Sequence, residues 1–354
     1  MTAATDALIA PLTTLRLGGP AARLLDARAE DDLIRAVRDA DDAGEPVLVL
    51  AGGSNVVVAD AGFAGTVVRV LTRGIAFEDL GEHVRLTVQA GEPWDDLVAL
   101  TVGEGLAGLE CLSGIPGSTG ATPIQNVGAY GQEVAATIER VRTWDRAARA
   151  VVELGAGDCG FGYRSSRFKG ADTHVVLAVT FLLRRSPRSE PLRYPELARA
   201  LGARAGDAVP LADVRDAVLR LRRGKGMVVD PADPDSVSAG SFFTNPVLDA
   251  RAFAALEERA RARLGAGARV PRYPEQDGRV KTSAAWLIEH AGFRKGLRRG
   301  PVGISAKHAL ALVNRGGART EDLVALAREI AAGVRDVFGV DIVPEPVFVG
   351  HRWR

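Results

Sequence analysis

The chain has few cysteines and no long apolar run. Its 354 residues include only two cysteines, Cys111 and Cys159, which are too few for a disulfide framework and fit a reducing compartment. No apolar run approaches the roughly 20 residues that a membrane helix needs. Residues 1–15 lack the basic and apolar regions of a secretory signal. These absences argue against a disulfide-rich secreted domain and a membrane protein, and they predict a soluble protein of the cytoplasm.

The sequence also lacks an excess of charge and a metal-binding cluster. Basic residues number 45 and acidic residues 44, so no chain-wide field favours nucleic acid or an anionic membrane. Local basic clusters at 220–225 and 294–299 are typical of solvated faces, with a small anionic ligand as the alternative. The five histidines are scattered without metal-ligand spacing. We therefore expect no nucleic-acid partner, no membrane and no metal.

The composition provides ample material for hydrophobic cores. A chain of 354 residues with 47% hydrophobic residues predicts two or three globular domains. A stretch rich in proline and aspartate at 230–236 suggests a boundary between domains. Hydrophobic periodicity predicts helices over 31–43, 93–103, 211–222, 250–264, 282–291 and 320–338. Strand-like runs cover 46–50, 56–59, 66–71, 84–90, 139–144, 151–154, 175–183, 309–314 and 340–350. The order strand, helix, strand indicates an α/β arrangement in the first 75 residues.

A first glycine-rich turn follows the predicted strand at 46–50. It comprises Gly52, Gly53, Ser54 and Asn55, where glycines allow backbone N–H groups to approach a phosphate. The turn matches neither the phosphate-binding P-loop nor the dinucleotide fingerprint. A tight turn without a ligand is the alternative.

A second glycine-rich stretch, residues 112–133, is too long for a simple connection. Glycines interleaved with hydroxyl and amide residues offer many hydrogen-bond donors and little bulk, which suits a pyrophosphate and a flat ring system. No cationic side chain lies within it, which argues against phosphoryl transfer. An ordered structural loop is the alternative, but two such loops beside predicted strands favour a dinucleotide.

Three further stretches carry candidate chemistry. Arg164 follows an aromatic residue and could bind a carboxylate, although an exposed turn arginine is the simpler interpretation. Ser241 lies in a turn without a histidine or lysine base nearby in the sequence, so it could donate a proton or merely stabilise the turn. Glu345 lies between two prolines and is either a rigidly held carboxylate or an exposed edge-strand residue.

Taken in order, these stretches resemble one family, the UDP-N-acetylenolpyruvoylglucosamine reductases. The resemblance runs from Thr14 to Gly350, and its most specific parts are IPGSTGATPIQNVGAYG (115–131), YRSSRF (163–168), AGSFFTNP (239–246) and PE (344–345). It implies an α+β fold: a two-domain FAD-binding unit of the vanillyl-alcohol-oxidase (PCMH) type and a C-terminal α/β substrate-binding domain. The implied domains are 1–75 with 336–354, then 76–226, then 227–335. An intervening loop around Tyr194 resembles the longer form of the family.

The resemblance also implies roles for individual residues. Arg164 matches the arginine that polarises the enolpyruvyl carboxylate, Ser241 the proton donor, and Glu345 the carboxylate opposite that group. The matching substrate-binding positions are Tyr163, Tyr194, Lys225, Asn245 and His308, the last being a glutamine facing the uridine diphosphate in some members. The implied FAD-binding positions are Gly52, Gly53, Ser54, Asn55, Ser113, Gly114, Ile115, Pro116, Gly117, Ser118, Thr119, Gly120, Pro123, Gln125, Asn126, Gly128, Ala129 and Arg222.

The implied reaction is the reduction of UDP-N-acetylglucosamine enolpyruvate to UDP-N-acetylmuramate in peptidoglycan precursor synthesis. NADPH reduces FAD, a hydride passes from flavin N5 to C3 of the enolpyruvyl group, and Ser241 protonates C2. We expect a monomer with non-covalent FAD, because residues 51–65 and 113–131 contain no histidine to tether it. The alternatives are a sugar-lactone or alcohol oxidase on the same scaffold, and a non-catalytic descendant of the enzyme. The second predicts loss of the reacting residues, yet all three are present.

Overall fold

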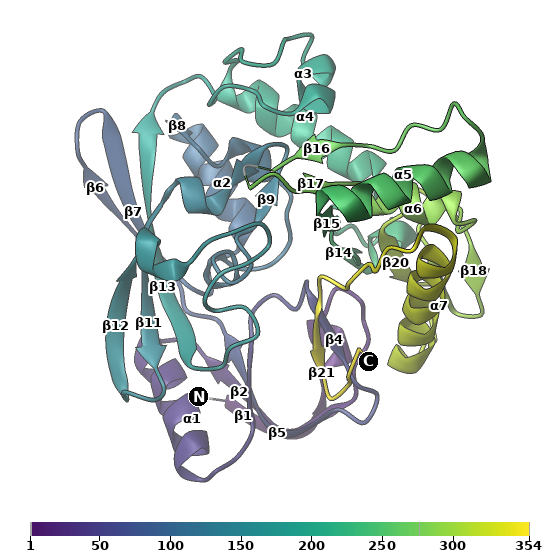
Figure 1. Cartoon of the computed structure of the whole chain (residues 1–354). Coiled ribbons are helices and arrows are strands. Elements are labelled where there is room, and N and C mark those ends of the chain that lie inside the picture. Colours follow the sequence, from purple (N-terminus) through teal and green to yellow (C-terminus); the bar gives the residue numbers. More distant parts are fainter. Residues whose placement is uncertain (1, 276, 354) are drawn as a thin grey trace. The chain divides into compact units, whose positions relative to one another are not determined.

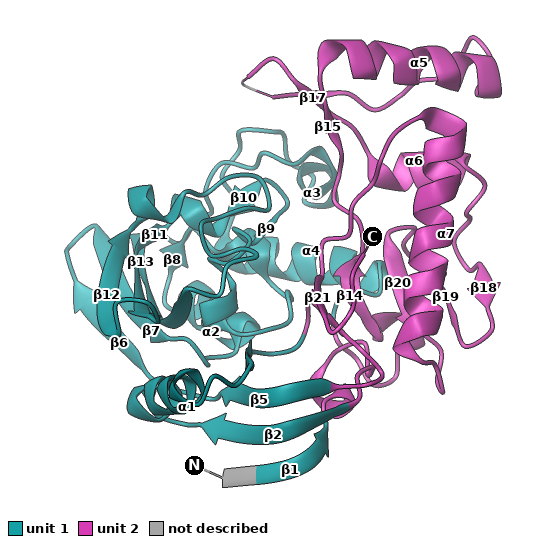
Figure 2. Cartoon of the chain, turned by 60° about the horizontal axis from the view of Figure 1, so that its bottom comes forward, with its two compact units in different colours: residues 1–8, 20–53, 63–228 teal, residues 9–19, 54–62, 229–354 magenta. Residues whose placement is uncertain are grey.

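The computed structural model describes residues 2–275 and 277–353 (Figure 1). The chain divides into two compact units that are each discontinuous in sequence (Figure 2). Unit 1 comprises residues 1–8, 20–53 and 63–228, and unit 2 comprises residues 9–19, 54–62 and 229–354. The three-domain division expected from the resemblance stays a prediction.

Unit 1 contains two main sheets. Its strands are β1 (Thr2–Leu8), β2 (Pro20–Ala27), β3 (Val47–Leu50), β5 (Phe63–Val70), β6 (Ile75–Asp79), β7 (His83–Gln89), β8 (Leu106–Ala107), β9 (Gly128–Ala129), β10 (Gln132–Glu133), β11 (Ile138–Asp145), β12 (Ala150–Gly155) and β13 (His174–Arg185). Its helices are α1 (Glu30–Asp42), α2 (Trp94–Gly103), α3 (Pro195–Ala200) and α4 (Leu211–Gly224). The first sheet has the order β1-β2-β5-β3, and the second has the order β12-β11-β13-β7-β6.

The first sheet confirms the α/β arrangement predicted for the first 75 residues. β2 and β3 both run parallel to β5, and α1 connects β2 to β3. Helix α1 begins with Glu30, Asp31 and Asp32, whose charges favour the positive end of the helix dipole. Its buried residues Leu33, Ala36, Val37 and Ala40 recur at helical spacing, and the first three join one core with the sheets. Strands β1 and β2 were not predicted.

Unit 2 is built around a smaller sheet with the order β14-β20-β19-β18. Its strands are β4 (Val56–Val58), β14 (Ser238–Ser241), β15 (Val247–Leu248), β16 (Tyr273–Pro274), β17 (Val280–Lys281), β18 (Arg298–Arg299), β19 (Val302–Ile304), β20 (Ala311–Asn314) and β21 (Val347–Val349), and its helices are α5 (Ala250–Leu264), α6 (Ala284–His290) and α7 (Thr320–Phe338). Helix α7 contacts β19, β20, α5 and α6 over one buried core. Its predicted bounds are confirmed, and Gly339 ends it in the left-handed conformation with φ 70°.

The last strand is shorter than predicted. The expected strand over 340–350 is confined to β21, which pairs in parallel with β4. Pro344 and Pro346 have no N–H to donate to a sheet, so the preceding residues cannot continue the pairing. The pairing of β4 with β21 joins residues 56–58 to the C-terminal part of the chain within unit 2.

Candidate active site

The two glycine-rich loops predicted from the sequence meet in unit 1. A Cβ atom placed on Gly52 would lie 2.6 Å from the Cα of Gly117, which is closer than real side chains come. Gly117 itself has φ 119°, and its carbonyl accepts from the N–H of Trp94 at 3.0 Å. The second loop is thereby fixed to the start of α2 while its backbone touches the first loop. The contact requires glycine at both positions.

Three hydroxyl groups of the second loop donate to backbone carbonyls of unit 1. Ser113 Oγ donates to Glu110 O at 2.7 Å, Thr119 Oγ1 to Glu92 O at 3.1 Å, and Thr122 Oγ1 to Thr119 O at 2.7 Å. The hydroxyl protons of Ser113 and Thr119 are therefore taken by nearby carbonyls, and the expected contacts of these residues with FAD stay predictions. The N–H groups of Gly52, Gly53, Ile115 and Gly117 donate to no atom of the described chain.

Two buried polar groups beside the loops have no partner within residues 2–275 and 277–353. They are Ser118 Oγ, in the second loop, and Arg222 Nε, on α4. Arg222 approaches the loop at Gly114, where an added Cβ would lie 3.4 Å from its Nε. Burial lowers the pKa of Arg222 to about 10, and the charges of Tyr130 and Asp95 counteract only part of that loss. Arg222 Nη2 donates to Met227 O at 2.8 Å, so only its Nε lacks a partner. A buried hydroxyl and a buried guanidinium N–H without partners are costly unless a ligand satisfies them.

These observations fit FAD. Free backbone N–H groups suit a pyrophosphate, Arg222 supplies a buried positive charge, and the small residues of the loops leave room for a flat ring system. Ile115 and Ala129 pack against the hydrophobic core of unit 1 and so anchor the second loop to it. Pro116, Gly120, Pro123 and Gln125 lie on the same loop, and Gly120 packs so closely on Ala90 that a Cβ would lie 2.5 Å from its methyl group.

Arg164 is held against the second glycine loop. Residues 162–165 form a tight turn in which Gly162 and Ser165 exchange backbone hydrogen bonds of 3.0 and 3.2 Å, and Arg164 has φ 50°. Arg164 Nη2 donates to Gly128 O at 2.6 Å, and its guanidinium lies 5.4 Å from the ring centre of Tyr163. A non-glycine residue in the left-handed region is strained and persists where the surroundings hold it in place.

Two further side chains fasten this turn to the loop. Asn126 Nδ2 donates to Gly162 O at 3.0 Å, and Ser166 Oγ donates to Ile124 O at 2.6 Å. Asn126 Nδ2 also lies 2.9 Å from Glu133 Oε2, so its amide is fully engaged within the protein. The Asn126 side chain thus links the second glycine loop to the Arg164 turn, and its expected contact with the cofactor stays a prediction. The position of Arg164 therefore depends on residues 124–128.

A cluster of tyrosines and charged residues surrounds Lys225. Tyr194 is 42% exposed and packs edge-on against Tyr130, with ring centres 5.5 Å apart. Lys225 lies 5.6 Å from the ring centre of Tyr130, and its Nζ pairs with Glu196 Oε2 at 2.7 Å. Burial raises the pKa of Tyr130 to about 12. The sequence indicated Tyr194 and Lys225 but not Tyr130, which lies on the second glycine-rich stretch, or Glu196, which lies on α3.

Ser241 has a histidine partner in unit 2. It ends β14, and its Oγ lies 3.4 Å from His308 Nε2. The histidine belongs to a turn in which Ser305 Oγ accepts from the N–H groups of Lys307 and His308 at 3.0 and 3.2 Å. The expectation of a serine without a nearby base is therefore wrong in space, although it holds along the sequence.

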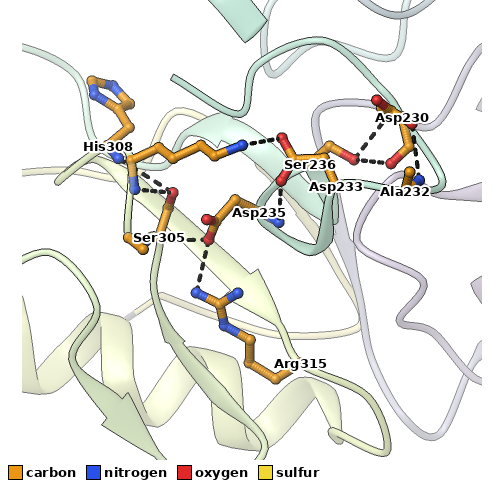
Figure 3. Close-up of polar contacts among 10 residues, drawn as sticks. Asp230, Ala232, Asp233, Asp235, Ser236, Ser305, His308 and Arg315 are labelled. Carbon is orange, nitrogen blue, oxygen red and sulfur yellow. Dashed lines mark hydrogen bonds and ion pairs between the residues drawn. The ribbon is translucent and has the colours of Figure 1, made fainter. Parts of the chain in front are cut away.

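Two ion pairs stabilise this turn. Asp235 is 5% exposed; its Oδ1 accepts from Arg315 Nη2 at 2.7 Å and from the N–H of Ala306 at 3.1 Å. Lys307 Nζ pairs with Asp233 Oδ2 at 2.8 Å. Figure 3 shows the His308 ring pointing away from Asp235 and Arg315. The pairs therefore fix the backbone of the turn and leave the ring directed elsewhere.

Glu345 and Asn55 lie beside the Ser241 strand within unit 2. The N–H of Glu345 donates to Phe242 O at 2.8 Å, and Phe243 forms an isolated antiparallel β-bridge with Pro344. The N–H of Val347 donates to Asn55 O at 2.9 Å, and Asn55 Nδ2 lies 3.5 Å from Glu345 O. The structure therefore places the candidate proton donor, the candidate carboxylate and Asn55 on neighbouring segments, with Ser54 next in the chain. The side chain of Asn245 is bonded to α6, where its Oδ1 accepts from the N–H of Ala284 at 3.0 Å.

Two negative findings apply to the described part of the chain. No group of three or more His, Cys, Asp or Glu residues there is arranged to hold a metal ion. None of its helices is both long and apolar enough to cross a membrane. Both cysteines are buried and unpaired, and burial raises the pKa of the Cys159 thiol to about 11.

Comparison with known proteins identifies the two parts of the chain. Residues 21–154 match the family model for an FAD binding domain, and residues 231–349 match that for the C-terminal domain of UDP-N-acetylenolpyruvoylglucosamine reductase. The predicted α+β fold, with an FAD-binding part followed by a C-terminal domain, is thus confirmed.

Individual relatives align with this chain over nearly its whole length. The UDP-N-acetylenolpyruvoylglucosamine reductase of Thermobifida fusca is 60% identical over 97% of this chain and 96% of that protein. That of Streptomyces coelicolor is 58% identical over 98% of this chain and 90% of that protein. The crystal structure of UDP-N-acetylenolpyruvylglucosamine reductase (MurB) from Thermus caldophilus aligns with a TM-score of 0.65 and 27% identity over 97% of each chain. The chain therefore belongs to the UDP-N-acetylenolpyruvoylglucosamine reductase family of FAD-dependent oxidoreductases.

Proposed function

We propose that the chain reduces UDP-N-acetylglucosamine enolpyruvate to UDP-N-acetylmuramate for peptidoglycan synthesis, with NADPH as the reductant. The observation that carries the proposal is the placement of Ser241 and Glu345 on adjoining segments, with the N–H of Glu345 donating to Phe242 O. A candidate acid and a candidate carboxylate carried by adjoining backbone segments suit a reaction that builds and then protonates a negative charge. The names of the relatives support the same substrate.

FAD would be held by Gly52, Gly53 and the second glycine loop of unit 1, and the family resemblance also implies contacts from Ser54 and Asn55. The unpaired N–H groups of Gly52, Gly53, Ile115 and Gly117 suit its pyrophosphate, and Ser118 and Arg222 offer the buried polar atoms described above. Bound FAD supplies the hydride that adds to C3 of the enolpyruvyl group.

The protein's own residues would manage the charge that develops at C2. Arg164, strained and hydrogen-bonded to Gly128 O, would pair with the enolpyruvyl carboxylate and stabilise its extra electron density. Ser241 would donate its hydroxyl proton to C2. Tyr163, Tyr194, Lys225 and Asn245 would position the substrate, with Lys225 near its phosphates. A monomer working in the cytoplasm completes the proposal, and sedimentation analysis checks the monomer.

The test is steady-state oxidation of NADPH by the FAD-loaded protein with and without UDP-N-acetylglucosamine enolpyruvate. We expect oxidation that depends on the enolpyruvyl sugar and ends when one equivalent has been consumed per NADPH. Substrate-independent oxidation alone, or acceptance of a simple alcohol as electron donor in place of NADPH, would contradict the proposal. The second outcome would favour an oxidase on the same scaffold.

The FAD is expected to be non-covalent, because neither cofactor loop contains a histidine and both cysteines lie buried outside residues 51–65 and 113–131. Acid precipitation of the purified protein should release the yellow flavin into the supernatant. A yellow precipitate after repeated washing would reveal a covalent bond and refute this expectation.

Replacing Arg222 with methionine should change stability and FAD affinity in opposite directions. The side chain is 8% exposed, and its Nε has no partner in the described chain. A methionine of similar length removes the buried charge. The free energy of unfolding of the FAD-free protein should therefore stay the same or rise by about 1 kcal/mol. FAD should bind about 10- to 100-fold more weakly, which corresponds to loss of one charged hydrogen bond. Calorimetry of the apoprotein and flavin titration measure both; exposed Arg220→Met on the same helix is the control.

Glu196 is expected to compete with substrate phosphate for Lys225. Its carboxylate pairs with Lys225 at 2.7 Å, and both side chains are about one-third exposed or less. Glu196→Gln should lower the KM for the enolpyruvyl sugar roughly three- to fivefold with kcat unchanged, because the ammonium no longer has to leave a carboxylate. Glu190→Gln, which breaks the exposed pair with Arg184, serves as control. An unchanged or raised KM would show that Lys225 does not meet the substrate's phosphates.

A further inference from the structure

Ser241 cannot complete a catalytic cycle by itself. When its hydroxyl gives a proton to C2, the Oγ–H bond breaks, the C2–H bond forms, and an alkoxide remains on the serine. An alkoxide is strongly basic and must be reprotonated before the next turnover. The imidazole of His308 is placed to supply this proton, because its Nε2 lies 3.4 Å from Ser241 Oγ. Catalytic hydrogen bonds are often this long before substrate binds.

A set of hydrogen bonds holds the backbone around His308 in place. Ser305, at 0% exposure, accepts the N–H of His308, and its own N–H donates to Ala311 O at 2.8 Å. The N–H of Ala311 donates back to His308 O at 3.2 Å, while the N–H of Phe242 donates to Leu310 O at 2.7 Å. Residues 305–311 therefore form a closed turn tied to the residue after Ser241. Such a turn presents the ring at a constant place relative to the serine.

The charged groups near this turn are largely paired with one another. Lys307 pairs with Asp233, and this bond raises the pKa of the Lys307 ammonium. Asp235 pairs with Arg315, and the His308 ring points away from both (Figure 3). Glu345, whose N–H bonds Phe242 O, is the other carboxylate on a segment adjoining Ser241. The imidazole is thus the neutral-pH proton carrier that directly meets the Ser241 hydroxyl.

We infer that His308 is a positioning residue that orients the Ser241 hydroxyl and returns its proton after each reduction. The inference rests on the proposed function and replaces the expected contact of His308 with the uridine diphosphate. The Nε2–H bond of the imidazolium breaks as the Oγ–H bond re-forms, and the neutral imidazole then takes a proton from water. No oxidant or reductant takes part in this exchange, because only protons move.

The test compares the wild-type holoenzyme with His308→Gln in the two half-reactions, followed by rapid-mixing flavin absorbance across pH. Glutamine retains a hydrogen bond to Ser241 but does not titrate. We expect NADPH to reduce the flavin of the variant within twofold of the wild-type rate. Reoxidation by the enolpyruvyl sugar over repeated turnovers should slow about 100-fold. Wild-type turnover should fall at high pH, where imidazolium is lost. This fall should be absent in the variant.

Three outcomes separate this inference from its alternatives. A raised substrate KM with an unchanged rate and pH profile would overturn it and assign His308 to the nucleotide instead. A variant with wild-type rate, KM and pH profile would also overturn it. If the wild-type protein showed no substrate-dependent flavin reoxidation at all, the proposed function itself would fail, which the variant comparison cannot mimic. The control is His290→Gln, because His290 stacks on Trp286 at 4.1 Å elsewhere in unit 2 and should leave the profile unchanged.

Discussion

Replacing Ser241 with alanine is expected to leave flavin reduction by NADPH intact and to slow reduction of the enolpyruvyl sugar about 10³- to 10⁴-fold. The hydroxyl is the candidate acid next to Glu345 and His308, and loss of a general acid costs this much where water cannot replace it. Rapid-mixing absorbance separates the two half-reactions, so each rate is measured on the same protein sample.

The control for Ser241→Ala is a serine-to-alanine change elsewhere in unit 2. Ser283 caps α6 by accepting from the N–H of Trp286 at 3.2 Å. Ser283→Ala should lower the free energy of unfolding by about 1 kcal/mol and leave both half-reactions unchanged. If Ser241→Ala reoxidised its flavin with the enolpyruvyl sugar at the wild-type rate, the proton would have to come from another group.

Replacing Gly52 with alanine is expected to abolish FAD binding. The added methyl would lie 2.6 Å from Gly117 Cα and 3.4 Å from Gly117 N, and both are backbone atoms that cannot rotate away. The two loops must separate, which displaces the N–H groups that would hold the pyrophosphate. We expect a purified protein without yellow colour and without activity, and flavin titration should detect binding at least 100-fold weaker. Backbone collisions in a packed region cost several kcal/mol.

Gly103→Ala is the matched control in unit 1. Nothing lies within 4 Å of a Cβ at Gly103, which ends α2, so alanine should be neutral or slightly stabilising. A yellow, active Gly52→Ala protein would mean that the close approach of the two loops is not needed for the cofactor. A colourless Gly103→Ala protein would mean that loss of FAD reflects general sensitivity of unit 1.

The sequence predicted best those features that local patterns determine. Helix α7 was bounded correctly because apolar residues recur at helical spacing from Leu323 to Phe338 and Gly339 supplies the left-handed end. The glycine loops were identified from composition alone, although the engagement of Ser113 and Thr119 within the loop depends on folded neighbours. Strand β1 escaped detection because its sequence, TAATDAL, has no clear apolar alternation.

The relation between Ser241 and His308 could not be predicted from spacing. The two residues are 67 positions apart and meet because β14 pairs with β20, with Ser241 opposite Ala311. No local propensity encodes that pairing. The brackets from Asn126 and Ser166 to the Arg164 turn are likewise non-local, spanning 36 and 42 positions. The sequence thus indicated the candidate reacting residues one by one, and only the fold reveals which groups hold them in place.

The most direct test of the account is a single turnover in D2O. The FAD-loaded protein is reduced, freed of excess NADPH, and mixed with one equivalent of UDP-N-acetylglucosamine enolpyruvate. The account predicts that the flavin is reoxidised and that the product carries deuterium at C2 in one configuration, because one fixed acid, Ser241, protonates that carbon. A flavin that stays reduced, or a product with both configurations at C2, would contradict it.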